Sequence, residues 1–171
     1  MNVDIFLDRD GTLIKDSGYI SNPSEIIFLN GVLENLFEFN SRGFRLHLVS
    51  NQSGVGRGII SRSQFESVDF EFRNLLRRNQ ITLDSVHYCL HAPIEGCECR
   101  KPNLLSFSKV ESEFPLVKKY SGMIGNSESD RESAYNFGIK YWNIDEHEPL
   151  SFIETSKSLI SYFERIKLED Q

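Results

Sequence analysis

Short apolar segments alternate along this chain with longer segments in which apolar residues recur at helical spacing. The short segments predict strands over residues 3–7, 44–49, 86–89, 120–124 and 139–144. The longer ones predict helices over 31–42, after a capping box of Ser61 and Gln64, from Pro102 onward with this proline in the first turn, over 130–137 and over 151–166. Residues 15–29 are expected to be irregular, and residues 52–57 are expected to form a loop. This alternation is typical of βαβ units, so we expect an α/β fold with a mostly parallel sheet and helices on both faces.

The length of 171 residues predicts one domain, residues 1–171. The sequence is 39% hydrophobic and 26% charged, which is ordinary for a globular protein. Its net charge of −6 argues against nucleic acid or an anionic membrane as a partner, because both favour basic surfaces. The apolar runs are too short to span a bilayer, and a motif follows Met1 too closely for a signal peptide. We therefore expect a cytoplasmic monomer.

Polar residues of unusual type gather where the predicted strands end. They are Asp8, Asp10, Ser50, Asn51, Lys101 and Asn126. Ligands of parallel α/β sheets bind outside the carboxyl ends of the strands, so these residues predict a site.

Asp8 and Asp10 are two acids, two positions apart, directly after a buried strand. Such a pair is costly unless a cation compensates it, and Mg²⁺ takes hard oxygen ligands of this kind. One carboxylate could then attack phosphorus and the other could transfer protons. The alternative is a solvated turn without chemistry.

All three cysteines lie in one short segment that also contains a histidine: Cys89, His91, Cys97 and Cys99. Three thiolates and one imidazole suit a closed, tetrahedral zinc site. Redox-active thiols are the rival interpretation, but no Cys-x-x-Cys is present. The zinc loop, residues 89–99, would order the segment that precedes Arg100 and Lys101.

The segment Asp8-Arg9-Asp10-Gly11-Thr12 resembles the first motif of the haloacid dehalogenase (HAD) superfamily of phosphohydrolases. Val49–Gly58 and Arg100-Lys101-Pro102 resemble the second and third motifs of the branch that holds heptose 1,7-bisphosphate and histidinol-phosphate phosphatases. The resemblance implies a Rossmann-like domain, here without an insert large enough for a cap domain. It also implies that Asp8 is the nucleophile, Asp10 the general acid and base, and Ser50 and Lys101 phosphoryl-binding groups. Further substrate contacts are expected from Asn51, Gln52, Ser53, Arg57, Arg100 and Ser127.

The fourth motif departs from the family pattern at Gly125-Asn126-Ser127. The family usually has an aspartate where this chain has Asn126, and a basic, substrate-contacting residue where it has Ser127. The resemblance implies Mg²⁺ held by Asp8, the backbone carbonyl of Asp10 and the amide oxygen of Asn126, with Asp130 as support. Two alternatives follow: an enzyme with a weaker metal site, or a degenerate phosphate-binding relative.

The segment Asp16-Ser17-Gly18-Tyr19 resembles the substrate-binding segment of the heptose enzymes. The resemblance therefore favours hydrolysis of the 7-phosphate of D-glycero-D-manno-heptose 1,7-bisphosphate, in lipopolysaccharide or other surface-polysaccharide precursor synthesis. The short zinc loop instead resembles histidinol-phosphate phosphatases, which keeps that activity as an alternative. A DNA 3′-phosphatase shares the first motif, but this chain lacks a basic track for nucleic acid.

Overall fold

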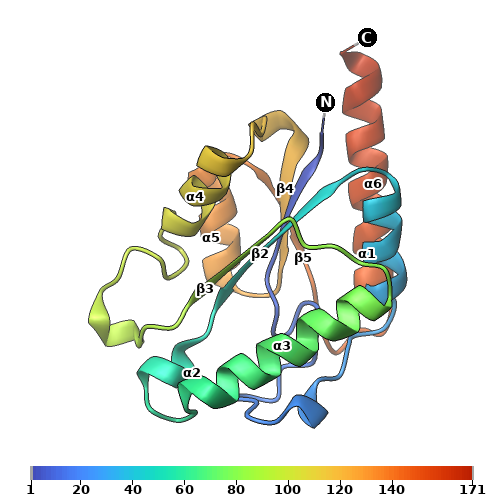
Figure 1. Cartoon of the computed structure of the whole chain (residues 1–171). Helices are drawn as coiled ribbons and strands as arrows, with labels where there is room; N and C mark the ends of the chain where they lie inside the picture. The colour runs from blue at the N-terminus through green and yellow to red at the C-terminus, as the bar shows by residue number, and fades with distance from the viewer. Residues whose placement is uncertain (1, 171) are drawn as a thin grey trace.

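Residues 2–170 are described by the structure, a computed structural model, and they form one five-stranded sheet with helices on both faces (Figure 1). The strands are β1 (Asp4–Leu7), β2 (Arg45–Asn51), β3 (Ser85–Cys89), β4 (Ser121–Gly125) and β5 (Lys140–Asn143). The helices are α1 (Val32–Ser41), α2 (Ser53–Gly56), α3 (Arg62–Arg78), α4 (Leu105–Glu113), α5 (Glu128–Phe137) and α6 (Ser151–Glu169). The predicted fold class is confirmed.

The central strand of the sheet is β1. Neighbouring strands are all parallel, in the order β3-β2-β1-β4-β5. The chain proceeds from β1 to β2 on one side and later returns to β4 on the other, so the strand order reverses beside β1. Ligands of open α/β sheets bind outside the carboxyl ends of the strands at such a reversal. Asp8 and Asp10 follow β1 at this point.

Alternate residues of β1 pack into two separate apolar cores. Ile5 and Leu7 belong to the larger core with α1, α3 and α6, and Phe6 belongs to the smaller core with α4 and α5. In the smaller core, the ring of Phe6 stacks on that of Phe107 with 4.8 Å between centroids. A shift of β1 by one residue would exchange the two sets, so burial on both faces fixes its register. The position of Asp8 is fixed with it.

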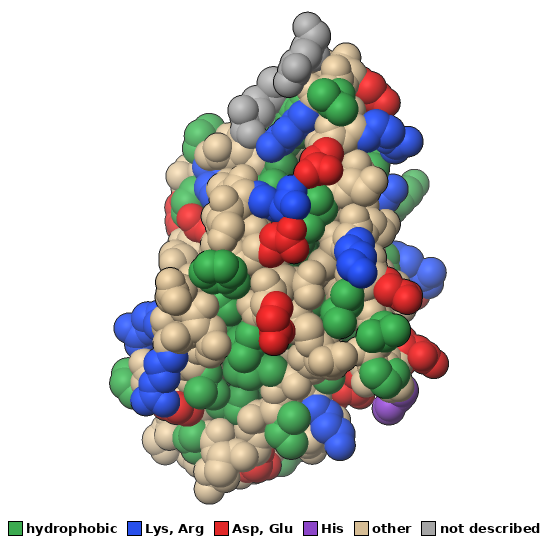
Figure 2. All heavy atoms as spheres, turned by 90° about the vertical axis from the view of Figure 1, so that its right-hand side faces the viewer, with side chains coloured by type: hydrophobic (Ala, Val, Ile, Leu, Met, Phe, Trp, Pro, Cys, Tyr) green, Lys and Arg blue, Asp and Glu red, His purple; other side chains and the backbone are tan. Residues whose placement is uncertain are grey.

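The face formed by α1 and α6 carries interspersed acidic and basic side chains (Figure 2). Arg42, which caps α1, bonds Glu38 of the same helix at 2.7 Å and Glu164 of α6 at 2.6 Å. On this face the basic side chains are thus partly neutralised and form no continuous basic track. Within residues 2–170, every helix is too short or too polar to cross a membrane.

Two local predictions are wrong. The stretch from Gln52 to Arg57, expected to be a loop, contains the short helix α2. Pro102 precedes α4 instead of lying in its first turn, since the helix starts at Leu105. The reason is that the side chain of Asn51 bonds both the backbone N–H and the backbone C=O of Lys101. These bonds hold the backbone around Lys101 against the end of β2, so the helix begins only after this segment.

Most predicted elements lie close to their observed positions. The Ser61/Gln64 capping box is present at the start of α3. Strand β2 extends beyond its predicted end because Ser50 and Asn51 continue to pair with β3. These two residues are therefore fixed by strand hydrogen bonds instead of lying in a loop.

Candidate active site

An ion pair between Asp8 and Lys101 occupies the carboxyl end of β1. The Nζ of Lys101 lies 2.7 Å from Oδ1 of Asp8 and 2.6 Å from Oδ1 of Asp130. It also donates to the backbone carbonyl of Val49 at 2.6 Å. The Lys101 side chain is only 2% exposed, so one buried ammonium group pairs with two carboxylates, one at the end of β1 and one in the first turn of α5.

The electrostatic balance of this cluster is negative. Burial raises the pKa of Asp8 to about 6; the charges of Asp130 and Asp10 act in the same direction, and Lys101 opposes them. Burial alone would lower the pKa of Lys101, but the charges of Asp8 and Asp130 outweigh it and raise the pKa. An additional cation would therefore be stabilised here, and the oxygen donors present fit a hard divalent ion.

The side chain of Gln52 joins Asp10 to Ser50. Its Nε2 donates to Oδ2 of Asp10 at 2.5 Å and to Oγ of Ser50 at 3.0 Å, and its Oε1 accepts from Nη2 of Arg9 at 2.8 Å. Arg9 itself also bonds Asp10. No role of Arg9 was predicted from the sequence. The available signal was a basic residue between two acids of the motif.

Asn51 holds Lys101 in position through its side-chain amide. Its Oδ1 accepts from the backbone N–H of Lys101 at 3.0 Å, and its Nδ2 donates to the Lys101 carbonyl at 3.2 Å. Both polar ends of the amide are thus used by the protein. The expected contact between Asn51 and the substrate stays a prediction, whereas its contact with Lys101 is present in this structure.

The fourth motif forms the start of α5. Ser127 is the N-cap: its Oγ accepts from the backbone N–H of Asp130 at 3.2 Å and donates to Oδ2 of Asp130 at 2.7 Å. The same Oδ2 accepts from the backbone N–H groups of Asn126 and Ser127. Asp130 is therefore fixed on the helix cap through Oδ2, while its Oδ1 lies within ion-pair distance of Lys101. The hydroxyl of Ser127 caps the helix in this structure, and its expected contact with the substrate stays a prediction.

Asn126 lies against the loop that carries Asp10. The hydroxyl of Thr12 donates to Oδ1 of Asn126 at 3.4 Å. Gly11 has a φ of +70°, and a Cβ there would lie 2.0 Å from Nδ2 of Asn126. Glycine is thus required both for the turn and for the close approach. The contact brings the amide of Asn126 beside the Asp8–Thr12 loop, where the predicted Mg²⁺ site needs it.

The four predicted zinc ligands converge at the end of β3. Sγ of Cys99 lies 3.0 Å from that of Cys89 and 3.2 Å from Nδ1 of His91, and Sγ of Cys97 lies 3.4 Å from that of Cys89. All four potential ligand atoms lie within 4.8 Å of one another. Three sulfurs and one imidazole nitrogen at this spacing fit a tetrahedral zinc ion.

This Cys/His loop packs directly on α2. The backbone N–H of Gly56 donates to the carbonyl of Leu90 at 2.9 Å. A Cβ at Gly56 would lie 2.3 Å from the backbone nitrogen of Ala92, so only glycine allows this approach. Since Arg100 and Lys101 follow the last cysteine, the loop connects the second motif to the third.

The remaining predicted substrate contacts lie farther out. Asp16, Ser17, Gly18 and Tyr19 form an exposed segment, and the ring of Tyr19 packs on Gly54, where a Cβ would lie 2.6 Å from Cδ1. Ser53 is buried at the start of α2, and Arg57 is exposed at its end. Arg100 is half-buried, and its Nη1 has no hydrogen-bond partner within residues 2–170.

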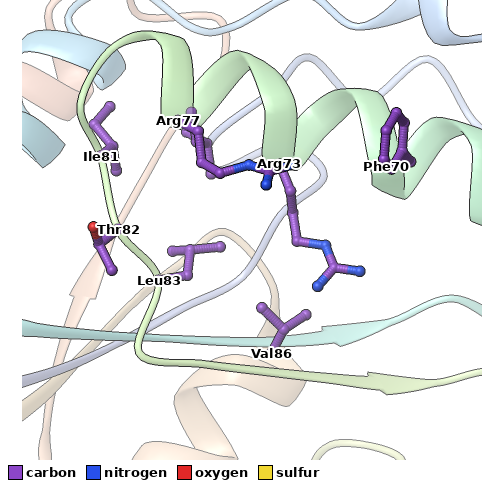
Figure 3. A pocket seen from close by; sticks show the side chains of 8 residues that line it. Phe70, Arg73, Arg77, Ile81, Thr82, Leu83 and Val86 are labelled. Atoms are coloured by element: carbon purple, nitrogen blue, oxygen red, sulfur yellow. The ribbon is translucent and has the colours of Figure 1, made fainter.

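A separate hollow of about 440 Å³ lies between α3 and the start of β3 (Figure 3). Its lining includes Phe70, Leu83 and Val86, with Arg73 and Arg77 from the helix. These residues lie in the second half of α3, in the segment that connects it to β3 and at the amino-terminal end of β3. The hollow is therefore distinct from the cluster around Asp8, and none of the predicted site residues lines it.

Comparison with known proteins gives close relatives but no matching family model. A D-glycero-β-D-manno-heptose-1,7-bisphosphate 7-phosphatase of Helicobacter pylori (strain J99) is 36% identical over 140 residues, which cover 81% of this chain and 80% of the relative. A D-glycero-α-D-manno-heptose-1,7-bisphosphate 7-phosphatase of Campylobacter jejuni is 35% identical over 136 residues, 79% of this chain and 77% of the relative. The chain belongs to the heptose bisphosphate phosphatase family of the HAD superfamily.

The members of this family are phosphoric monoester hydrolases, which confirms the resemblance and the predicted enzyme class. A crystal structure of D,D-heptose 1,7-bisphosphate phosphatase from B. bronchiseptica, complexed with magnesium and phosphate, has the same fold with a TM-score of 0.84. The two sequences are 23% identical, and the match covers 94% of this chain and 99% of the other. The roles of individual residues stay predictions and are taken up below.

Proposed function

We propose that this protein hydrolyses the 7-phosphate of D-glycero-D-manno-heptose 1,7-bisphosphate through a phosphorylated Asp8. The observation that carries the proposal is the cluster of Asp8, Lys101, Asp10 and Ser50 at the reversal of strand order. The relatives from H. pylori and C. jejuni, named as 7-phosphatases of the β and α anomers respectively, support the substrate. We further propose that the enzyme acts in the cytoplasm as a monomer, in surface-polysaccharide precursor synthesis.

The reaction has two halves. In the first, an Asp8 oxygen attacks the 7-phosphoryl group, the bond from phosphorus to the sugar oxygen breaks, and Asp10 gives a proton to that oxygen. In the second, Asp10 takes a proton from water as the water oxygen attacks phosphorus. The bond between phosphorus and Asp8 then breaks, which releases inorganic phosphate and restores the Asp8 carboxylate and the protonated Asp10.

Charge stabilisation during transfer falls to Lys101 and Ser50. Lys101 lies against Asp8, so its ammonium group is next to the bond that forms. The hydroxyl of Ser50 is linked to Asp10 through Gln52, whose Nε2 donates a hydrogen bond to each of them. Donors fixed in this way stabilise charge on the phosphoryl oxygens without reorganisation. The half-buried Arg100 and the exposed Arg57 are the cations available for the distal phosphate.

The oxygens that would hold Mg²⁺ are the Asp8 carboxylate, the backbone carbonyl of Asp10 and Oδ1 of Asn126. The cluster contains more carboxylates (Asp8, Asp10 and Asp130) than cations (Arg9 and Lys101), which supports this assignment. A bound Mg²⁺ would neutralise charge on the phosphoryl group and orient it toward Asp8. Because Asn126 supplies no charge, the affinity should be lower than with an aspartate at that position.

For the Cys/His cluster we propose a structural zinc ion. Its four ligands would complete a closed shell without an open position for substrate. The contact of Gly56 with Leu90 and the adjacency of Cys99 to Arg100 support a role in fixing the loops around the site. The ion would thus order the path that delivers Lys101 to Asp8.

A substrate panel tests the proposal. Phosphate release is measured with millimolar Mg²⁺ from both anomers of the heptose bisphosphate, from histidinol phosphate and from a 3′-phosphorylated oligonucleotide. The Asp8→Asn variant, purified in parallel, controls for contaminating phosphatases. The expected result is the highest kcat/KM with one heptose anomer and loss of that activity in the variant.

The other outcomes each point to a different function. A much higher kcat/KM with histidinol phosphate would replace the proposed substrate by that of the second branch. Preference for the oligonucleotide would indicate a nucleic-acid phosphatase. Failure to release phosphate from any member of the panel would favour a degenerate phosphate-binding relative, the alternative raised by Asn126.

A further inference from the structure

Arg9 is a charged side chain with an unusual environment. It lies between the two acids of the first motif, and its side chain is 2% exposed, which places it among the largest fully buried side chains of the described chain. Its Nη1 has no hydrogen-bond partner within residues 2–170. Burial of a guanidinium costs free energy unless the group is paired and hydrogen-bonded, so the contacts of its other nitrogens must compensate for this cost.

Those contacts hold the carboxylate of Asp10 by both oxygens. Nε of Arg9 donates to Oδ2 of Asp10 at 3.1 Å, and Nη2 donates to Oδ1 at 3.2 Å. A planar guanidinium that reaches both oxygens fixes the plane of the carboxylate as well as its distance. The orientation of Asp10 is therefore set by its neighbour in the sequence.

Gln52 completes the clamp from the second motif. Its Oε1 accepts from Nη2 of Arg9, and its Nε2 donates to Oδ2 of Asp10. Its backbone N–H donates to the carbonyl of Cys89 at 2.7 Å. Since guanidinium only donates and carboxylate only accepts, the amide of Gln52 has one possible orientation between them.

The far side of the guanidinium is also fixed. Cζ of Arg9 lies 5.8 Å from the centroid of the Tyr88 ring, and the Tyr88 hydroxyl donates to Oδ1 of Asp69 at 2.6 Å. Asp69 in turn accepts from Arg73 at 2.6 Å. The guanidinium is thus held between an aromatic face and the carboxylate of Asp10, an arrangement that a lysine ammonium would not reproduce.

We propose that Arg9 is a positioning residue that, together with Gln52, holds the carboxyl group of Asp10 in the orientation required for proton transfer between Asp10 and the leaving oxygen. This inference rests on the proposed function, in which Asp10 is the general acid. It assigns to Arg9 no contact with the substrate. Its effect should therefore depend on how much the leaving group needs a proton.

The test compares two substrates of different leaving groups. The sugar phosphate leaves as an alkoxide that needs protonation, whereas p-nitrophenyl phosphate leaves as a stable phenolate. For both, kcat/KM reports the steps up to transfer onto Asp8. In Arg9→Met we expect kcat/KM to fall by about 100-fold with the sugar phosphate and by less than about 5-fold with p-nitrophenyl phosphate. Arg9→Lys, which keeps the charge but not the planar fork, should behave like Arg9→Met.

Controls separate this role from general damage. Arg45→Met removes another arginine–aspartate pair, at the opposite end of β1, and should leave the ratio of the two kcat/KM values unchanged. If Arg9→Met does not fold, Gln52→Met removes the other half of the clamp and should reduce the sugar-phosphate value selectively. Equal losses with both substrates, or full activity in Arg9→Lys, would overturn the proposal. Absence of turnover in the wild-type protein would instead refute the proposed function.

Discussion

Oδ1 of Asp130 lies 2.6 Å from Nζ of Lys101, while Oδ2 of the same carboxylate caps α5. The charge of Asp130 is therefore already compensated by a buried ammonium group and by helix N–H donors. With Asn126 neutral, the negative charge left for a divalent cation comes mainly from Asp8, because Asp10 is paired with Arg9. This distribution makes the identity of residue 126 decisive for metal affinity.

Asn126→Asp should tighten Mg²⁺ binding, by roughly tenfold. The aspartate has the same shape as asparagine, so the close contact with Gly11 is preserved. The measurement is a Mg²⁺ titration of activity together with calorimetry. Asn79→Asp, which adds the same charge beyond the end of α3, should leave the titration unaltered. An unchanged Mg²⁺ midpoint in Asn126→Asp would remove Asn126 from the ligand set.

Asp8→Asn should lower turnover by more than about 1,000-fold without loss of the fold. The amide cannot form the phosphoryl intermediate. The substitution also removes a buried carboxylate, and burial raises the pKa of that carboxylate to about 6. In the metal-free protein, the melting temperature at pH 7 should therefore equal or exceed that of the wild type. Phosphate release and thermal unfolding by circular dichroism are the measurements. Activity close to wild type would exclude Asp8 as the nucleophile.

Sequence alone was sufficient for the sheet and for the centre of the site. Asp8 and Ser50 directly follow predicted strands, and parallel strands bring their carboxyl ends to one edge, which Lys101 reaches after the Cys/His loop. The four Cys/His ligands could be grouped because they lie within eleven residues, residues 89–99. Sheet topology determines which side chains meet in the first case, and local spacing in the second.

Hydrogen-bond partners that are far apart in the sequence, or that depend on the local backbone conformation, could not be predicted in this way. Asn51 and Ser127 have side chains that bond either a ligand or nearby backbone, and only the fold decides between the two. In this structure Lys101 uses the amide of Asn51, and α5 uses the hydroxyl of Ser127. Arg9 was missed for the same reason, since its partner Gln52 lies 43 residues away.

Loss of the proposed zinc ion should loosen the segment that carries Lys101. Cys97→Ser removes one thiolate from the four-ligand set, so the zinc content should fall well below one ion per chain. We expect a lower melting temperature and a parallel loss of activity, because Arg100 and Lys101 directly follow the loop. Elemental analysis and thermal unfolding measure these effects. His147→Ala, an exposed histidine outside the cluster, is the control.

Absence of zinc from wild-type protein prepared without chelators would contradict the assignment. Full activity and an unchanged melting temperature in Cys97→Ser would show that the cluster has no structural role. If Cys97→Ser keeps its zinc but loses activity, the loss of activity comes from the changed conformation of the loop and not from loss of the ion.

A second buried charge cluster lies at the amino end of the sheet, remote from the catalytic edge. Asp4 is fully buried, and its Oδ1 accepts from Nε of Arg45 at 2.7 Å and lies 2.9 Å from Nε2 of His47. Its Oδ2 accepts from Nη2 of Arg45 at 2.8 Å. Burial alone would raise the pKa of Asp4, but the hydrogen bonds from His47 and Arg45 lower it below the ordinary value of 3.8.

This pair predicts a loss of stability in acid. Because the pKa of Asp4 is lower in the folded chain than in the unfolded one, the unfolded chain takes up the proton first as the pH falls. The contribution of Asp4 is therefore present above pH 3.8 and is lost as the pH falls through the folded-state pKa. Asp4→Asn should lower the free energy of unfolding by about 3 kcal/mol at pH 7, and the difference should shrink toward pH 3. Urea unfolding at pH 7, 5 and 3 measures it, with the exposed Glu132→Gln as the control. A difference that stays constant down to pH 3 would mean that Asp4 stabilises the fold through its shape and not through its charge.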